Sequence, residues 1–163
     1  MAIHQIIVRG EPIIKEGIAT ESITPGDLLD FVAGSAATPS TSYLSPYLKK
    51  HAIAGGNASK MIALEQDYIG HLGGGTTELM IDKTYAALDQ VRYGVFRPGD
   101  EAYMRLKASE NVSYGNYLES NGDGTLRIAL GGSAAAAQNE RLVGRALGIS
   151  NSASIARLVV EVL

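Results

Sequence analysis

The sequence of 163 residues contains neither cysteine nor tryptophan. Without cysteine the chain has no disulfide, thiolate nucleophile or thiolate metal ligand, so we expect its stability to come from packing or from association with other chains. Basic charge is also scarce, because the formal net charge is −3 and the longest basic run is Lys49-Lys50. A protein that grips the phosphates of a nucleic acid needs a basic surface, so we expect no nucleic-acid partner.

Long apolar runs are absent as well. No segment approaches the roughly 20 apolar residues that a bilayer-spanning helix needs. Residues 1–9 have no basic stretch leading into a continuous apolar core, as a secretory signal would. We therefore expect no membrane partner, and synthesis in the cytoplasm.

The residues that are abundant favour short strands and tight turns. The chain has 19 glycines and 8 tyrosines, together with many isolated Ile and Val residues. Two Pro-Gly-Asp turns, at 25–27 and 98–100, each precede a β-prone segment. Apolar residues then alternate with polar ones at 102–107, and the same period recurs at 157–162. The sequence predicts a mainly β fold with a small barrel-like, or β-tulip-like, body.

The clearest hairpin joins residues 116–120 to 125–129, because Asn121-Gly122-Asp123-Gly124 supplies residues that accept positive φ at the reversal. Further strands are predicted at 60–64, 79–81, 91–96 and 142–147. Short helices are predicted at 82–89, which begins with an Asp cap, and at 134–141, where a flexible loop fits equally well.

The first 22 residues differ from the rest. Two apolar clusters are interrupted by Gly10 and Pro12, which predicts an extended arm at 1–22 followed by a barrel-like domain at 23–163. So apolar an arm needs a partner surface or the body of the domain to cover it. The residues expected to contact a partner surface or a neighbouring subunit are Ile6, Ile7, Val8, Ile13 and Ile14.

An internal repeat is also visible. Residues 25–30, 48–57 and 61–64 parallel residues 114–119, 126–132 and 143–147 in their order of apolar, glycine and asparagine positions. We interpret the repeat as two similar hairpin units that build one barrel-like body. In the first unit, the Ser-, Thr- and Pro-rich residues 33–47 replace the short turn as an exposed excursion.

Patterns for catalysis are incomplete. Residues 70–77 have the glycine spacing of a phosphate-binding loop, but Thr76 stands where that loop needs lysine. Residues 131–135 resemble a nucleophile elbow, but Ala135 replaces the last glycine and no histidine follows. His4, His51 and His71 lie in separate segments without metal-ligand spacing. We expect no enzymatic activity, no cofactor and no metal.

The carboxylates offer no acid-base pair either. Asp27, Asp30, Asp100, Glu101 and Glu119 are expected at turns and strand edges, where they would stay solvated and discourage edge-to-edge pairing.

In their order along the chain, the turn and strand motifs resemble those of tailed-bacteriophage head decoration proteins, or cement proteins. The motifs concerned are residues 25–27, 49–52, 54–57, 91–100, 114–127 and 157–163. The resemblance implies a structural virion protein on the outer capsid surface that binds the major capsid protein, self-associates as a homotrimer at quasi-threefold positions, and stabilises the expanded shell. It also implies that an N-terminal arm reinforces the shell contact, so that the five apolar residues of the segment 1–22 named above would contact the capsid.

Two alternatives belong to other classes. One is a β-barrel that binds a small molecule or a glycan, with residues 33–47 and 70–77 forming the rim of its site. The other is an enzyme that assembles its site from scattered acids with His51 or His71, for which the sequence offers no spacing signal.

Overall fold

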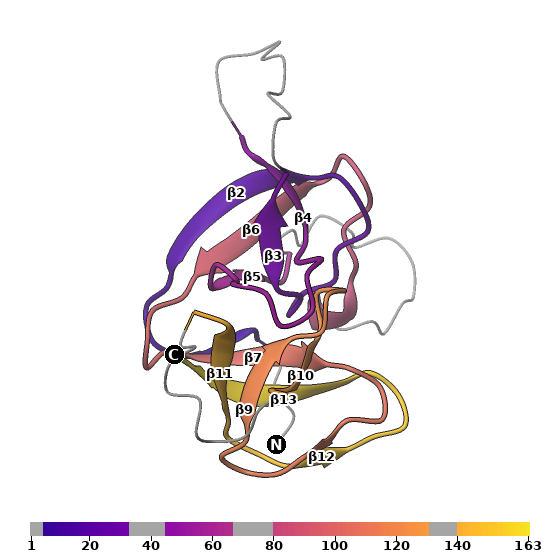
Figure 1. Ribbon diagram of the computed structural model, residues 1–163. Coiled ribbons are helices and arrows are strands. Elements are labelled where there is room, and N and C mark those ends of the chain that lie inside the picture. Colours follow the sequence, from indigo (N-terminus) through magenta and orange to yellow (C-terminus); the bar gives the residue numbers. More distant parts are fainter. Residues whose placement is uncertain (1–4, 33–44, 67–79, 131–139) are drawn as a thin grey trace.

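The computed structural model describes residues 5–32, 45–66, 80–130 and 140–163. Strands account for 46% of the structure and helix for 2%, and five strands close into a barrel. The prediction of a mainly β fold with a small barrel body is therefore confirmed. Figure 1 shows two layers of strands, with β2 to β6 above β7 to β13.

The lower layer is a closed barrel, which we call the C-terminal barrel. Its strands pair in the order β7-β10-β9-β11-β13, and β13 closes the ring by pairing with β7. The five strands are β7 (Glu101–Leu106), β9 (Tyr117–Ser120), β10 (Leu126–Ile128), β11 (Leu142–Ala146) and β13 (Ala156–Val162). Strand β1 (Ile7–Arg9) adds to β7, and β8 (Asn111–Val112) pairs with β12 (Ser150–Asn151).

The upper layer, which we call the N-terminal barrel, is a five-stranded sheet in the order β3-β4-β2-β6-β5. A bridge between Leu28 and Ile62 brings its two end strands together, so the sheet curls almost into a ring. Its strands are β2 (Ile13–Ala19), β3 (Leu29–Phe31), β4 (Tyr47–Lys50), β5 (Met61–Ala63) and β6 (Gln90–Val95).

The two barrels have the same topology. In each, the first strand runs parallel to the third and antiparallel to the fifth, the second is antiparallel to the third, and the fourth is antiparallel to the fifth. The register also matches: Ala19 pairs with Leu48 in the N-terminal barrel as Leu106 pairs with Leu126 in the C-terminal barrel. The repeated sequence units thus occupy corresponding places, but in two barrels rather than in one.

The turn before the second strand of each barrel is duplicated as well. The Thr24 N–H donates to Asp27 Oδ2, and the Ser113 N–H donates to Asn116 Oδ1, both at 2.8 Å. The third residue of each turn is a glycine with positive φ, 90° at Gly26 and 85° at Gly115. This agreement shows that the two units share local as well as overall structure.

The described residues form two apolar cores. The larger fills the C-terminal barrel and extends to the boundary between the barrels, where Leu28, Ile62 and Phe96 contribute from the upper layer. The smaller lies inside the N-terminal barrel around Leu48, Tyr85 and Tyr93. Neighbouring residues of one strand serve different cores, since Ile62 belongs to the larger and Met61 to the smaller. The barrels therefore share buried surface.

Most predicted strands are confirmed. The strands expected at 60–64, 91–96 and 142–147 are β5, β6 and β11, and the hairpin at 116–129 is β9 and β10. The alternation at 102–107 is confirmed by burial of Ala102, Met104 and Leu106, and the last strand buries its predicted face in the same way.

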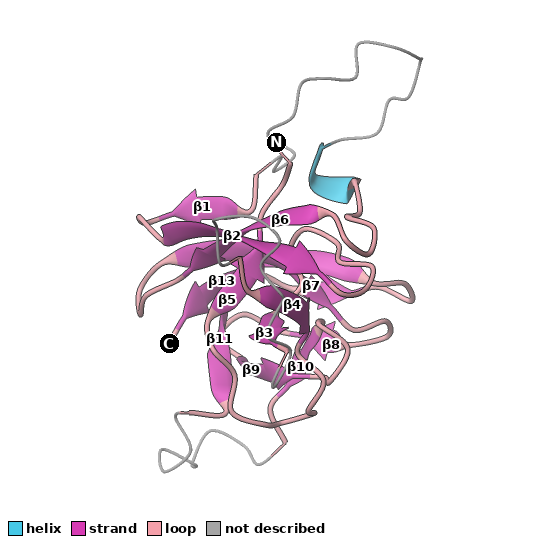
Figure 2. Cartoon of the chain, turned by 90° about the horizontal axis from the view of Figure 1, so that it is seen from above, coloured by secondary structure: helices cyan, strands magenta, loops and turns pink. Residues whose placement is uncertain are grey.

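The predictions around residue 80 are wrong. Residues Met80–Asp82 form a short 3-10 helix instead of a strand, drawn in cyan in Figure 2. The helix expected at 82–89 is absent because Tyr85 forms a bridge with Ile23 and donates its hydroxyl to the Leu64 carbonyl, 2.9 Å away. Tertiary pairing thus overrides the local signal. The helix expected at 134–141 lies mostly outside the described residues.

The segment expected to be an arm carries β1 and β2. Strand β1 pairs with the C-terminal barrel and β2 lies within the N-terminal barrel, so residues 7–19 run across both layers. Figure 2 shows β1 and β2 close together on one side of the molecule.

Candidate interaction surface

The five residues predicted to make contacts divide into a buried and an exposed group. Ile6 is completely buried in the chain's own larger core, and Ile7 packs partly against that core. Val8, Ile13 and Ile14 are exposed, at 39%, 46% and 49%. Ile6 therefore leaves the candidate set, because strand β1 covers β7 and turns this side chain inward. The exposed group, Val8, Ile13 and Ile14, is the candidate interaction surface.

Strand β1 is fixed on the C-terminal barrel by its backbone. The Tyr103 N–H donates to the Ile6 carbonyl at 2.8 Å, and the Ile6 N–H donates to Glu65 Oε2 at 3.0 Å. Arg9 approaches Glu101 at 3.7 Å on the surface. The chain then passes through Gly10, whose φ of 105° and close approach to Asp100 leave no room for a side chain. These contacts set the direction in which β2 begins.

Polar groups buried between the barrels hold the two layers together. His51 is 1% exposed; its Nδ1 lies 2.7 Å from Ser120 Oγ and its Nε2 lies 3.0 Å from the Asn57 carbonyl. The Gly55 N–H donates to the Ser120 carbonyl, and Lys60 Nζ donates to the Leu142 carbonyl. Burial lowers the pKa of Lys60. His51 is thus a structural residue that joins the barrels.

An ion pair crosses the same boundary. Arg105 Nη1 of the C-terminal barrel lies 2.7 Å from Asp27 Oδ1 in the turn of the N-terminal barrel, and the Asp27 side chain is 1% exposed. Burial raises the pKa of Asp27, although Arg105 and the Thr24 N–H act in the opposite direction. The Arg105 N–H also donates to the Gly26 carbonyl at 3.2 Å.

The expectation that the carboxylates stay solvated is wrong for three of them. Asp27, Asp100 and Glu119 are buried, at 0%, 9% and 2%. Glu119 accepts two hydrogen bonds from Arg127 on the neighbouring strand of its hairpin. The sequence does not indicate the partner of Asp27, because the fold brings it together with Arg105 of the other barrel.

Several residues and segments that the sequence analysis considered for chemistry lie outside the described residues. These are the glycine loop at 70–77, the elbow-like segment at 131–135, His4, His71 and most of the proposed ligand rim at 33–47. In the part of the chain that the structure describes, no group of three or more His, Cys, Asp or Glu side chains is placed to hold a metal ion. No helix of that part is long and apolar enough to cross a bilayer.

A polar hollow of about 410 Å³ lies where the two barrels meet. Arg105 and Arg157 line it, but each guanidinium already has a carboxylate partner, Asp27 and Asp82 respectively. The hollow therefore offers little uncompensated positive charge for an anion.

The chain is thus a protein of two small β-barrels, with the exposed apolar residues of the candidate interaction surface in β1 and at the start of β2. A similar fold is found in a solved structure of the N base of the head fibre gp8.5 of bacteriophage phi29, with a TM-score of 0.52 and 13% sequence identity. The match covers 94% of this chain and 98% of that chain. At this identity the similarity shows a common fold. No protein-family model and no curated protein matches the sequence.

Proposed function

We propose that this chain is a structural, non-enzymatic protein of a tailed-phage particle that binds the outer surface of the capsid and stabilises the assembled, expanded shell. The observation that carries the proposal is the fold, which is similar along nearly the whole of both chains to the base of a phage head fibre. The order of turn and strand motifs, which resembles that of head decoration proteins, supports the same role.

The way the two barrels are joined supports a role in stabilising a shell. The larger core includes residues of both barrels, and buried polar contacts join the barrels, so the body resists separation of the two layers. Val8, Ile13 and Ile14 supply exposed apolar area for contact with the major capsid protein, at roughly 25 cal/mol per Å² buried.

The proposed mechanism is mass action. A protein that binds the expanded lattice better than it binds free or unexpanded subunits stabilises that lattice by the difference in affinity. Many weak contacts add up when the protein binds as a homotrimer at quasi-threefold positions, because the subunits of one trimer attach together.

The proposal is tested on phage heads purified with and without this protein. After heating or osmotic shock, heads that carry the protein should keep their DNA under conditions in which bare heads release it. Equal losses from both preparations would contradict the stabilising role. Sedimentation equilibrium of the free protein tests the trimer separately, since a monomeric mass at micromolar concentration would contradict it.

A further inference from the structure

Among the described residues, one edge of β2 has no paired strand where β2 begins. Strand β6 pairs with β2 from Ile13 to Ile18, whereas β4, on the other side, reaches only Ile18 and Ala19. The Ile18 N–H points toward β4, because it donates to the Pro46 carbonyl at 2.9 Å. Backbone groups alternate along a strand, so those of Ile14 and Glu16 point the same way. Among the described residues, neither backbone N–H has a hydrogen-bond partner.

The corresponding edge of the C-terminal barrel is occupied. Counting back from the matched residues Ala19 and Leu106, Glu16 corresponds to Tyr103. The Tyr103 N–H donates to the Ile6 carbonyl of β1, and Ile7 of β1 pairs antiparallel with Ala102. The duplicated fold therefore contains this edge twice, once covered by β1 and once without a paired strand among the described residues.

The side chains along the covered edge of β7 and along the matching edge of β2 differ in exposure. Ala102, which β1 covers, is completely buried, whereas Lys15, which corresponds to it in β2, is exposed. All four residues from Ile13 to Glu16 are exposed, although β2 becomes buried at Gly17. An open backbone edge flanked by exposed isoleucines is the type of surface on which proteins add a strand from a partner.

We infer that the edge of β2 at Ile14–Glu16 receives an extended segment of another protein, antiparallel, in the place that β1 fills on β7. Given the proposed function, on which this inference rests, that segment belongs to a protein of the head shell. Its backbone pairs with the groups of Ile14 and Glu16 that face this edge, and its apolar side chains cover Ile13 and Ile14. Lys15 has no ion pair among the described residues, so it selects a carboxylate on the incoming strand.

A second copy of this chain is a poorer occupant. In a two-fold antiparallel pair of β2 strands centred on Lys15, which pairs Ile14 with Glu16, Lys15 lies directly opposite Lys15 of the other copy, and a pair centred on Glu16 places Glu16 opposite Glu16. A pair centred on Ile14 places Glu16 opposite Pro12, which has no N–H to donate. Like charges at opposite positions destabilise a strand pair. Charge complementarity therefore favours a different protein with an acidic residue at that position.

The test uses the Ile14→Pro variant of the full chain and heads purified without this protein. Proline removes the N–H that faces the open edge, and it spares the pairing with β6 because that pairing uses the odd-numbered residues. Pro12 already occupies the same side of the chain just before β2. Ile14→Val is the matched control, since it keeps the N–H and most of the apolar side chain.

We expect Ile14→Pro to bind heads about tenfold more weakly than the wild type, and Ile14→Val to bind within about twofold of it. Lys15→Glu should also weaken binding. Equal binding by wild type and Ile14→Pro would overturn strand addition but leave the proposed function standing. Failure of the wild type itself to bind heads would instead count against the proposed function.

Amide hydrogen exchange provides a readout that does not depend on a folded variant. In the free wild-type protein, the Ile14 and Glu16 amides should exchange rapidly, and on heads they should exchange at least about tenfold more slowly. Slow exchange in the free oligomer would show that another copy of this chain already covers the edge, which would overturn the inference. Unchanged exchange on heads that carry bound protein would overturn it as well.

Discussion

Asp27 is the residue on which the junction of the two barrels depends most directly. Its carboxylate closes its own turn through the Thr24 N–H and reaches across to Arg105, and burial raises its pKa. A buried charge of this kind is costly when its partner is removed, because the remaining charge stays poorly solvated.

Asp27→Ala should therefore lower the free energy of unfolding by about 3 kcal/mol. Arg9→Ala, which breaks the exposed pair with Glu101, is the control and should cost less than about 1 kcal/mol. Urea unfolding followed by circular dichroism measures both. Similar losses from the two variants would contradict the importance of the buried pair.

Asp123 gives stability a specific pH dependence. Although burial acts to raise the pKa of Asp123, hydrogen bonds from the Thr125 side chain and backbone and from Asn121 lower it below the ordinary value of 3.8. When the pH falls below about 3.8, the unfolded chain takes up a proton at Asp123 before the folded chain does, so this contribution to stability is lost.

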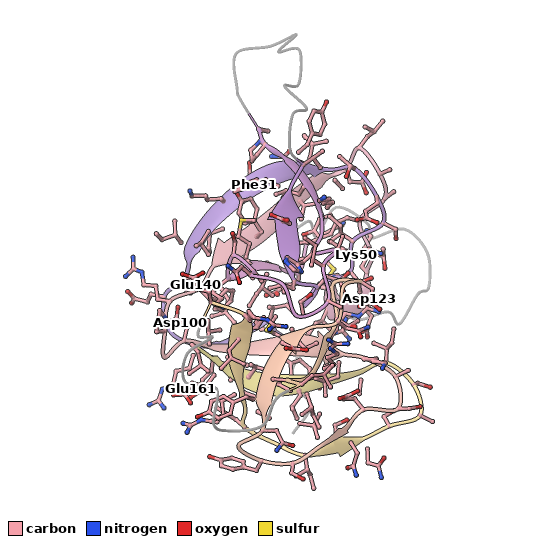
Figure 3. The ribbon with its side chains drawn as sticks, in the orientation of Figure 1. Phe31, Lys50, Asp100, Asp123, Glu140 and Glu161 are labelled. Atoms are coloured by element: carbon pink, nitrogen blue, oxygen red, sulfur yellow. The ribbon has the colours of Figure 1, made fainter. Side chains whose placement is uncertain are left out.

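Between pH 5 and pH 3, the free energy of unfolding of Asp123→Asn should consequently fall less than that of the wild type. This interval spans the ordinary carboxyl pKa of aspartate. The measurement is a series of urea titrations across this interval. Identical pH dependence in the two proteins would contradict the assigned role of Asp123. Figure 3 places Asp123 near Lys50, at the level where the barrels meet.

At the scale of elements, the duplicated turns allow a matched comparison. Gly26 and Gly115 both have positive φ, but their surroundings differ. A side-chain carbon added at Gly115 would meet nothing within 4 Å, whereas one at Gly26 would lie 3.0 Å from the Tyr103 carbonyl oxygen.

Gly115→Ala should thus lower the free energy of unfolding by about 1 kcal/mol, because of backbone strain alone. Gly26→Ala should cost about 1 kcal/mol more, because the added methyl also presses on β7. Thermal unfolding of the two variants measures the difference, and a larger loss at Gly115 than at Gly26 would contradict the described packing.

Elements with strong local signals could be predicted from the sequence. The β9–β10 hairpin follows from its Asn-Gly and Asp-Gly steps, and β7 and β13 follow from strict alternation. The closure of the barrels could not be predicted, because it depends on parallel pairing between strands far apart in the chain, β2 with β4 and β7 with β10. The helix expected at 82–89 failed for a similar reason, since Tyr85 pairs with Ile23.

The candidate surface was predictable only in part. Apolar clustering selected Val8, Ile13 and Ile14, which are exposed, together with Ile6, which is buried, and it gave no means of separating them. That distinction depends on the pairing of β1 with β7. The edge of β2 likewise could not be predicted from the sequence, because it is defined by how the strands of both barrels pair. Contact of the exposed residues with a capsid or a neighbouring subunit stays a prediction.

For the whole molecule, the shared core predicts that the barrels unfold together. Ile62 belongs to the N-terminal barrel but lies completely buried in the core that fills the C-terminal barrel. Ile62→Ala should cost about 3 kcal/mol, with a single unfolding transition for both barrels. Differential scanning calorimetry tests this, and two separated transitions would contradict cooperative unfolding. Ile53→Ala, at a side chain 64% exposed, is the control and should have little effect.

The proposed role on the phage head can be observed by electron cryo-microscopy of heads prepared with and without this protein. If the protein binds there as proposed, heads that carry it show additional density on the outer surface at quasi-threefold positions, with two stacked barrels that fit the fold in Figure 1. Identical surfaces in the two preparations would contradict that role.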